Sequence, residues 1–454
     1  MESQRIMQPA KPIKSLKEPP IVGSLLSYNK NRLAVFSRVV RECGDAGLFH
    51  FGPFPVIVFN APEFVHRVLV EHAYDFNKGV LMHNALEPLI GEGLLISEGD
   101  FHRRQRKLIA PSFQPKYVKC YADDTVRYGE QLQRAWKDGE IIDIGQEMTH
   151  LTMSIIGKVL FDADVFTETD ELGAAMTTAL EQANYALSHI FPLPLNWPTT
   201  RNKRTRNALA LIRGRIQQMI DERRAHIEEK NDFLSILLRA QGDDDKHMSD
   251  EQVRDESITL FGTGHETTAT GLTWAWYLLT QHPDAYQRLQ QEVDTVLRGH
   301  SPTYADLVNL PYTLQVFKEA IRLYPPAYAI GRVALHDIDL GDYLVHKGET
   351  VVICPYTLHR RQDYFPNPEM FVPDRFTPEN EKRLPYNAYL PFGAGPRTCI
   401  GSHFAMLEGH MLLATLAQRI TFNLVPKQRI EPEPNKTISM RAKYGMKMVV
   451  RRRN

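Results

Sequence analysis

The chain has 454 residues, which is long enough to bury a large hydrophobic core. Its 54 lysine and arginine residues balance 54 aspartate and glutamate residues, so no global field would draw it to nucleic acid or to an anionic membrane. The four cysteines form no C-x-x-C pair, which argues against a zinc knuckle or a disulfide framework and favours a reducing cytoplasm.

The N-terminal residues 1–17 are polar and lack the apolar centre of a signal peptide. No stretch approaches the roughly 18 apolar residues of a membrane-spanning helix, so we expect no membrane anchor. No linker interrupts the pattern. We therefore expect a single domain over 1–454, with a flexible N-terminal segment at 1–18.

The first regular elements are two short apolar runs, 48–52 and 55–59, which predict a β-hairpin. Over 120–240 the apolar positions recur at helical spacing, and prolines 192, 194 and 198 predict a break between two helices. Ser249 and Gln252 form a capping box, and the helix that it starts should reach His282-Pro283.

The rest of the chain continues the helical pattern. A polar helix is expected near 284–298 and another ends at Pro325-Pro326, whereas 333–344 and 350–353 resemble strands. A last helix should follow Cys399 directly. The sequence therefore predicts a mainly α fold with small β-sheets.

Residues 392–401, Phe-Gly-Ala-Gly-Pro-Arg-Thr-Cys-Ile-Gly, set Cys399 in a glycine-rich loop before this last helix. Glycines permit a tight turn and the close approach of a flat ligand, and helix amides favour a thiolate. Cys399 is therefore a candidate metal ligand. A structural cysteine would not need the surrounding pattern, and a phosphate loop would need a third glycine and a preceding strand.

The loop fits Phe-x-x-Gly-x-Arg-x-Cys-x-Gly at every fixed place and resembles the haem-binding loop of the cytochrome P450 family. The resemblance implies a triangular prism of helices, with haem b between the long central helix and the cysteine-loop helix. Cys399 would be the axial thiolate, and Phe392, Gly393 and Gly401 would contact the haem.

Two further motifs follow the order of the same family. Glu319 and Arg322 lie three apart on a helix, and Phe371-Val372-Pro373-Asp374-Arg375-Phe376 comes later in the chain. Most such acid–base pairs are solvated surface pairs. The resemblance instead implies that Glu319, Arg322 and Arg375 form a buried structural network behind the haem loop.

The middle of the long helix contains two glycines, Gly262 and Gly264, which suggest close approach or local unwinding. Glu266 and Thr267 resemble the oxygen-activating pair of the family, where a bulge in the helix makes room for dioxygen and water. The alternative is a polar helix face with hydroxyls bonded to the backbone. Thr263 departs from the family's usual alanine or glycine, and its hydroxyl either orients a substrate or bonds to its own backbone.

The basic run 102–107 is ordinarily a solvated helix face, and nucleic-acid binding is a more remote alternative. His102 and Arg106 resemble the pair that binds a haem propionate, and Arg332 and Arg397 would complete the set. Arg103 and Lys107, on the outward side, would help to dock an acidic electron donor.

Together these resemblances imply a haem-thiolate monooxygenase that inserts one oxygen atom of O2 into a lipophilic small molecule. No flavin or iron–sulfur segment is present, so electrons from NAD(P)H would arrive through a separate ferredoxin and its reductase or a flavoprotein. We expect a cytoplasmic monomer that binds no nucleic acid. Two alternatives are a peroxide-using or rearranging haem-thiolate enzyme and a non-catalytic haem sensor. The candidate pocket segments are 80–97, 185–197 and 327–330 together with Thr263, and they include Ala327 and Ile330.

Overall fold

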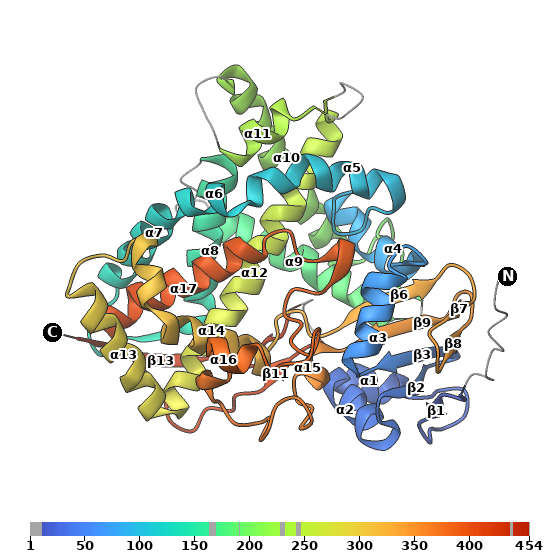
Figure 1. The fold of residues 1–454 in the computed structure, drawn as a ribbon. Coiled ribbons are helices and arrows are strands. Elements are labelled where there is room, and N and C mark those ends of the chain that lie inside the picture. Colours follow the sequence, from blue (N-terminus) through green and yellow to red (C-terminus); the bar gives the residue numbers. More distant parts are fainter. Residues whose placement is uncertain are drawn as a thin grey trace, which may run out of the picture.

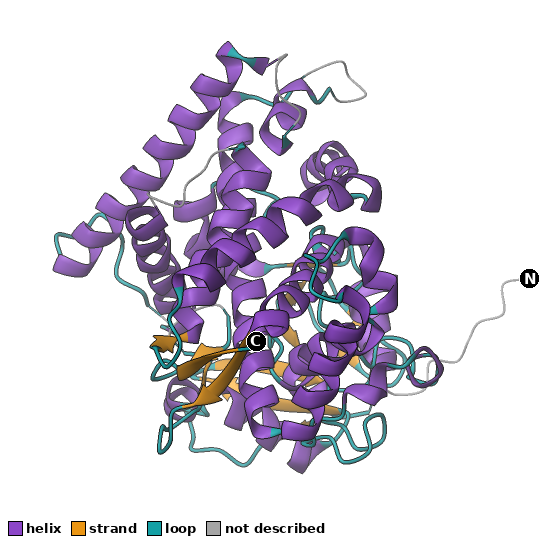
Figure 2. Ribbon diagram, turned by 90° about the vertical axis from the view of Figure 1, so that its left-hand side faces the viewer, coloured by secondary structure: helices purple, strands orange, loops and turns teal. Residues whose placement is uncertain are grey.

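The computed structural model describes residues 11–162, 169–189, 191–227, 232–241, 247–435 and 439–453. Helices form most of the molecule, whose outline is roughly triangular, and the largest sheet lies at one corner (Figure 1). A view from the side shows the same division, with the strands in the lower half (Figure 2). The predicted fold class is therefore confirmed.

The helices follow one another along most of the chain. They are α1 (Leu25–Lys30), α2 (Arg32–Cys43), α3 (Pro62–His66), α4 (Gly79–Ile90), α5 (Gly99–Ile109), α6 (Pro115–Val118), α7 (Ala122–Ala135), α8 (Ile144–Phe161), α9 (Thr169–Ser188), α10 (Thr200–Ala225), α11 (Phe233–Arg239), α12 (Asp250–Gln281), α13 (Pro283–Leu297), α14 (Pro311–Leu323), α15 (Pro355–Leu358), α16 (Pro378–Glu381) and α17 (Ser402–Arg419).

The strands are short. They are β1 (Lys14–Ser15), β2 (Ala46–Phe51), β3 (Phe54–Phe59), β4 (Phe76–Asn77), β5 (Ile141–Asp143), β6 (Ile330–Ala334), β7 (Ile338–Asp339), β8 (Leu344–Val345), β9 (Thr350–Ile353), β10 (Ile420–Leu424), β11 (Pro432–Glu433), β12 (Arg441–Ala442) and β13 (Lys447–Arg452).

The largest sheet has the strand order β1-β2-β3-β9-β6-β4. Strands β2 and β3 pair in antiparallel register, which confirms the predicted hairpin. Of the N-terminal segment 1–18, residues 1–10 lie outside the described residues, and Lys14–Ser15 pair with β2 as strand β1. A three-stranded sheet, β10-β13-β5, joins the end of the chain to β5 and was not predicted.

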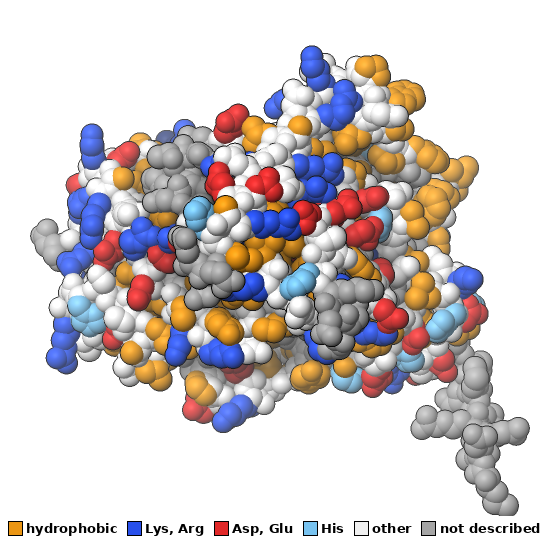
Figure 3. All heavy atoms as spheres, turned by 90° about the horizontal axis from the view of Figure 1, so that it is seen from above, with side chains coloured by type: hydrophobic (Ala, Val, Ile, Leu, Met, Phe, Trp, Pro, Cys, Tyr) orange, Lys and Arg blue, Asp and Glu red, His pale blue; other side chains and the backbone are white. Residues whose placement is uncertain are grey.

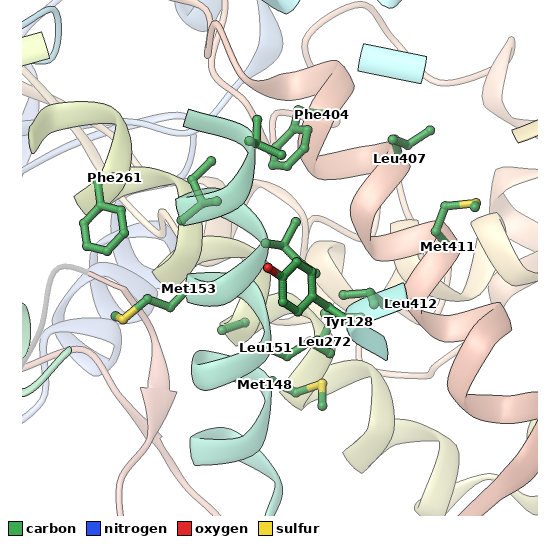
Figure 4. Packing of buried hydrophobic residues seen from close by; sticks show 14 of the residues in the cluster. Tyr128, Met148, Leu151, Met153, Phe261, Leu272, Phe404, Leu407, Met411 and Leu412 are labelled. Carbon is green, nitrogen blue, oxygen red and sulfur yellow. The ribbon is translucent and has the colours of Figure 1, made fainter. Parts of the chain in front are cut away.

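Helix α12 runs through the centre of the helical part. The Ser249–Gln252 capping box is present, and the helix ends one residue before His282-Pro283, as predicted. Most of its side chains are buried, because α8, α14 and α17 pack around it. Figure 4 shows Met148 and Leu151 of α8 in one cluster with Leu272 of α12 and Leu412 of α17.

The proline-containing connection between α9 and α10 breaks the helical pattern where the sequence predicted. The side-chain amide of Asn202 donates to the carbonyl oxygens of Pro194 and Trp197 at 2.8 and 3.1 Å, which fixes the connection on the start of α10.

Lysine, arginine, aspartate and glutamate side chains all lie on the upper face of the molecule (Figure 3). None of the helices within the described ranges is both long enough and apolar enough to cross a membrane.

Candidate active site

The cysteine loop is closed by its own backbone. The Cys399 amide donates to the Phe392 carbonyl at 2.9 Å, and the Thr398 hydroxyl donates to the Gly395 carbonyl at 2.8 Å. Helix α17 begins three residues after Cys399. The thiol is thus held at the start of the helix that follows it.

Two glycines of this loop have left-handed backbone angles, with φ of +71° at Gly393 and +69° at Gly395. A Cβ atom on Gly395 would lie 1.9 Å from the Leu69 carbonyl oxygen, so no side chain fits there. A Cβ atom on Gly393 would lie 3.8 Å from Cδ1 of Ile330. Gly395 therefore permits the approach of protein backbone, and Gly393 faces the predicted pocket residue Ile330.

The Cys399 side chain reaches solvent but is partly buried by the surrounding protein. This burial raises the pKa of the thiol, whereas the Gly401 amide and the Arg106 charge act to lower it. The sequence argument for a thiolate considered only the lowering effects. A coordinating metal cation would reverse the balance, because it deprotonates a bound thiol.

A cluster of cationic side chains lies near the loop. Burial and then the charges of Arg332 and Arg397 lower the pKa of Lys78 to about 7. Burial and then the charge of Arg397 lower the pKa of His102 to about 3 and that of Arg332 to about 10. Each of these groups is therefore destabilised as a cation by the others, which is the environment that an anionic ligand relieves.

Glu98 is the acidic side chain that contacts this cluster. The Arg397 guanidinium binds the Glu98 carboxylate through Nη2 and the Ser97 carbonyl through Nη1, the latter at 2.6 Å. The Lys78 amide donates to Glu98 Oε1 at 2.9 Å. A single carboxylate does not balance Lys78, Arg332 and Arg397, so the cluster remains net positive.

Lys78 belongs to no motif, and the sequence analysis missed it. It follows β4, which pairs with β6 so that Asn77 lies opposite Val333. This pairing carries Lys78 to Arg332, 254 positions away in the chain. No local signal could have found it.

The structure brings Glu319, Arg322 and Arg375 together. Arg322 binds Glu319 in bidentate fashion, with Nε–Oε2 at 2.6 Å and Nη2–Oε1 at 2.8 Å, and both side chains are 0% exposed. Arg375 Nε lies 3.3 Å from Glu319 Oε1. The Val372 amide also donates to that oxygen, at 2.9 Å. The carboxylate is thus fully occupied by donors.

The local bulge that the family resemblance implied at Glu266 and Thr267 is not seen, because α12 is an α-helix from Asp250 to Gln281. The hydroxyls of Thr263 and Thr267 donate to the carbonyls of Thr259 and Thr263 at 2.7 and 3.0 Å, one turn back in each case. These bonds are compatible with an intact helical ladder.

The glycines of this segment serve helix packing. A Cβ atom on Gly262 would lie 3.3 Å from the Met176 sulfur of α9, and one on Gly264 would lie 3.0 Å from Ile156 of α8. Close approach is present at both glycines, but the nearest atoms belong to side chains of neighbouring helices, whereas the sequence had suggested that something flat packs there.

Glu266 and Thr267 point to different sides of α12, because consecutive helical residues are about 100° apart. The Glu266 side chain is 5% exposed; its Oε1 accepts from the Ser439 hydroxyl at 2.6 Å and lies 3.0 Å from Arg441 Nε. Ser439 and Arg441 are distant in sequence and were not predicted. Thr267 is only half-buried.

The family profile described as Cytochrome P450 matches residues 14–449. The chain belongs to this family. Cyclooctatin synthase of Streptomyces melanosporofaciens is 37% identical to this P450 over 92% of each chain. Pentalenene oxygenase of Streptomyces avermitilis is 29% identical over 95% of this chain and 96% of the relative. Leukotriene-B4 omega-hydroxylase 3 of Mus musculus is 32% identical over 93% of this chain and 85% of the relative.

Family membership establishes a haem-thiolate P450 monooxygenase, and the residues present fit that cofactor. Cys399 is a free thiol that reaches solvent at the start of α17. The cationic cluster of Lys78, Arg332 and Arg397 suits the two carboxylates of haem b. His102 is buried and Arg106 half-buried on one side of α5, as expected for residues that face the cofactor.

The three predicted pocket residues differ in environment. Thr263 and Ala327 are exposed and Ile330 is half-buried. Thr263 donates to its own backbone, which is one of the two alternatives that the sequence left open, although the oxygen can still accept a hydrogen bond.

Proposed function

We propose that this P450 hydroxylates or epoxidises a lipophilic small molecule with electrons from NAD(P)H, delivered by a separate redox protein. The observation that carries the proposal is the adjacent pair on α12, a buried carboxylate at Glu266 and a half-buried hydroxyl at Thr267. Reductive cleavage of O2 consumes protons, so the protein must supply a group that carries them and a hydroxyl that can pass them on.

The haem, once bound, supplies the redox chemistry, and the protein supplies orientation and protons. Thr267 holds its hydroxyl in one orientation through its bond to the Thr263 carbonyl, and its oxygen remains free to accept a second hydrogen bond. Glu266 takes up protons on the side of α12 that faces Ser439 and passes them toward Thr267. Both are proposed as catalytic residues.

A lipophilic substrate is supported by a cavity of about 210 Å³, open in part to solvent, between α4, α9 and α10. Most of its lining is apolar, with Asn84, Gln182 and Thr205 as the polar exceptions. It overlaps the segments 80–97 and 185–197, which the sequence marked as candidate pocket walls.

The names of the relatives narrow the class of candidate substrates. Pentalenene oxygenase and Cyclooctat-9-en-7-ol 5-monooxygenase are named for an alkene and an alkenol, and the mouse relative is named for a leukotriene. We infer a terpene hydrocarbon or alcohol as the first candidate substrate and a fatty acid as the second. The first is favoured because the 37% and 34% identical relatives are both named for cyclooctatin-type compounds.

The redox partner is proposed to be an acidic ferredoxin or flavoprotein. Arg103 and Lys107 are exposed on the outward side of α5, where they could contact it. The four cysteines are all unpaired, which supports a reducing cytoplasm. We expect a monomer without a nucleic-acid partner.

The test begins with a screen of terpene hydrocarbons, terpene alcohols and fatty acids for compounds that shift the haem spectrum. Turnover of the best ligand with NADPH and a surrogate ferredoxin system is then compared between wild type and Thr267→Ala. Product per NADPH should fall at least about tenfold, because general acid–base groups contribute roughly 10²–10⁴-fold.

The matched control is Thr280→Ala, near the C-terminal end of the same helix, where the hydroxyl also donates to backbone. Its coupling should equal that of wild type. Equal coupling in Thr267→Ala would refute the assignment of Thr267. Product formed with peroxide but not with NADPH would support the peroxide-using alternative, and reversible gas binding without turnover would support a sensor.

A further inference from the structure

The segment Ser439–Arg441 lies along one side of α12. Glu266, Thr270 and Trp274 are successively four residues apart and therefore share a helix face. The Trp274 indole donates to the Met440 carbonyl at 2.7 Å, and the Met440 amide donates to the Pro326 carbonyl at 3.2 Å. Met440 is thus fixed to α12 and to the segment that follows α14, independently of Glu266.

The residues on either side of Met440 both reach Glu266. The Ser439 hydroxyl donates to Glu266 Oε1 at 2.6 Å and receives a bond from the Thr270 hydroxyl at 3.4 Å. Arg441 Nε lies 3.0 Å from the same oxygen. One carboxylate oxygen therefore binds two donors from a single short segment.

Arg441 connects this buried carboxylate to the surface. Its side chain is 28% exposed, whereas that of Glu266 is 5% exposed. Its Nη2 atom is buried and has no hydrogen-bond partner within the described part of the chain. A buried guanidinium N–H in this position is a site that ordered water satisfies.

We propose that Arg441 is a positioning residue for proton delivery and that protons reach Glu266 from solvent along the Ser439–Arg441 side of α12. Arg441 and Ser439 hold the Glu266 carboxylate toward water bound at the guanidinium. A proton from bulk solvent passes through this water to the carboxylate, which leaves the water unchanged, and Glu266 then releases the proton on the Thr267 side and returns to its carboxylate form. The guanidinium stays protonated throughout.

A purely structural ion pair is the alternative. The segment is already attached through Trp274 and through the pairing of β12 with β11, so attachment does not need Arg441. The proposal rests on the proposed role of Glu266, and the two can be tested apart.

The test uses holoenzyme with NADPH, the surrogate ferredoxin system and the best ligand of the screen, because reductive cleavage of O2 takes up two protons from solvent whereas hydrogen peroxide brings its own. Rates are measured in H2O and D2O for wild type, Arg441→Gln, Arg441→Lys, Ser439→Ala and Glu266→Gln. Haem content and the carbon monoxide spectrum of the reduced protein report folding. Lys443→Gln is the control, because it removes one positive charge two residues beyond Arg441. The Lys443 Nζ atom lies 4.0 Å from Glu433 Oε2 and has no part in the proposed path.

Arg441→Gln should lower the rate about three- to tenfold, a part of the roughly 10²–10⁴-fold that a proton-transfer group contributes. It should also raise the solvent isotope effect. Arg441→Lys should restore most of the rate, Ser439→Ala should show a smaller loss in the same direction, and Lys443→Gln should match wild type.

The outcomes distinguish the proposed role of Arg441 from the proposed role of Glu266. Wild-type rates and isotope effects in Arg441→Gln, with a slow Glu266→Gln, would overturn the role of Arg441 and leave that of Glu266 intact. An unaffected Glu266→Gln would overturn both. If Arg441→Gln fails to retain haem, Ser439→Ala decides: an unchanged isotope effect there would overturn the proposed path.

Discussion

Arg322 and His359 hydrogen bond to each other in both directions. Arg322 Nη1 donates to the His359 carbonyl at 2.8 Å, and His359 Nδ1 lies 3.2 Å from the Arg322 carbonyl. His359 Nε2 accepts from the Leu390 amide at 2.8 Å. With Nδ1 donating and Nε2 accepting, the ring must be neutral. Through His359, the Glu319–Arg322 pair is thereby joined to the segment at Leu390 that leads into the cysteine loop.

This geometry predicts acid sensitivity. Burial, and then the charge of Arg322, lower the pKa of His359 to about 3, against an unfolded value near 6.5. Between these values the unfolded chain binds the extra proton, so stability is present above about pH 6.5 and is lost as the pH falls. From pH 7 to pH 5, His359 alone should reduce the free energy of unfolding by on the order of 2 kcal/mol.

Urea unfolding at several pH values measures this dependence. His359→Gln should unfold more easily at pH 7 but lose less stability on acidification than wild type. The control is His346→Gln, at an exposed histidine, which should keep the wild-type slope. An unchanged slope in His359→Gln would show that the ring does not titrate as the structure requires.

Glu319→Ala should yield protein that does not retain haem. The substitution leaves the Arg322 guanidinium buried without its carboxylate, and breaking a buried pair in this way costs about 3–5 kcal/mol. Haem content per polypeptide and urea unfolding measure the effect. Glu381→Ala is the control, because the Lys318–Glu381 pair at 2.7 Å is partly exposed and should contribute under about 1 kcal/mol. Normal haem content in Glu319→Ala would contradict the structural role.

The features that sequence reasoning found are those whose signals are local. The capping box at Ser249, the proline break before α10 and the loop around Cys399 each occupy a few consecutive residues, so their chemistry can be recognised without a fold. The network at Glu319 needed the order of several motifs, and the structure then brought its members together.

The features that could not be predicted from the sequence depend on contacts between residues far apart in the chain. Lys78 meets Arg332 only because β4 pairs with β6, and Arg441 meets Glu266 only because Met440 is held against Trp274. The prediction of a bulge in α12 was wrong for a related reason. A glycine can serve unwinding or helix packing, and only the positions of Met176 and Ile156 show that packing applies.

Gly409 of α17 should not tolerate a side chain. A Cβ atom there would lie 2.3 Å from ring atoms of the Phe317 side chain on α14, which must then move within a filled core. Gly409→Ala should cost about 1–3 kcal/mol, despite the better helix propensity of alanine. Thermal unfolding of the holoenzyme measures this change.

Two further variants test the cause of that cost. Gly214→Ala on α10, where nothing lies within 4 Å of the added Cβ, should instead stabilise the protein by about 0.5–1 kcal/mol. Combining Gly409→Ala with Phe317→Leu should cost less than the two single changes add up to. If Gly409→Ala stabilises the protein as Gly214→Ala does, the predicted clash is absent.

The cationic cluster predicts how the haem is retained. A charge-assisted hydrogen bond contributes about 1.5–3 kcal/mol, so Arg332→Gln and Lys78→Gln should each speed haem loss to a scavenger protein by at least about tenfold. Arg103→Gln, on the exposed side of α5, is the control and should lose haem at the wild-type rate. Reconstitution with haem dimethyl ester removes the two carboxylate charges, so the differences between variants and wild type should shrink. If they persist with the ester, Lys78 and Arg332 support the fold around the site and do not bind the haem carboxylates.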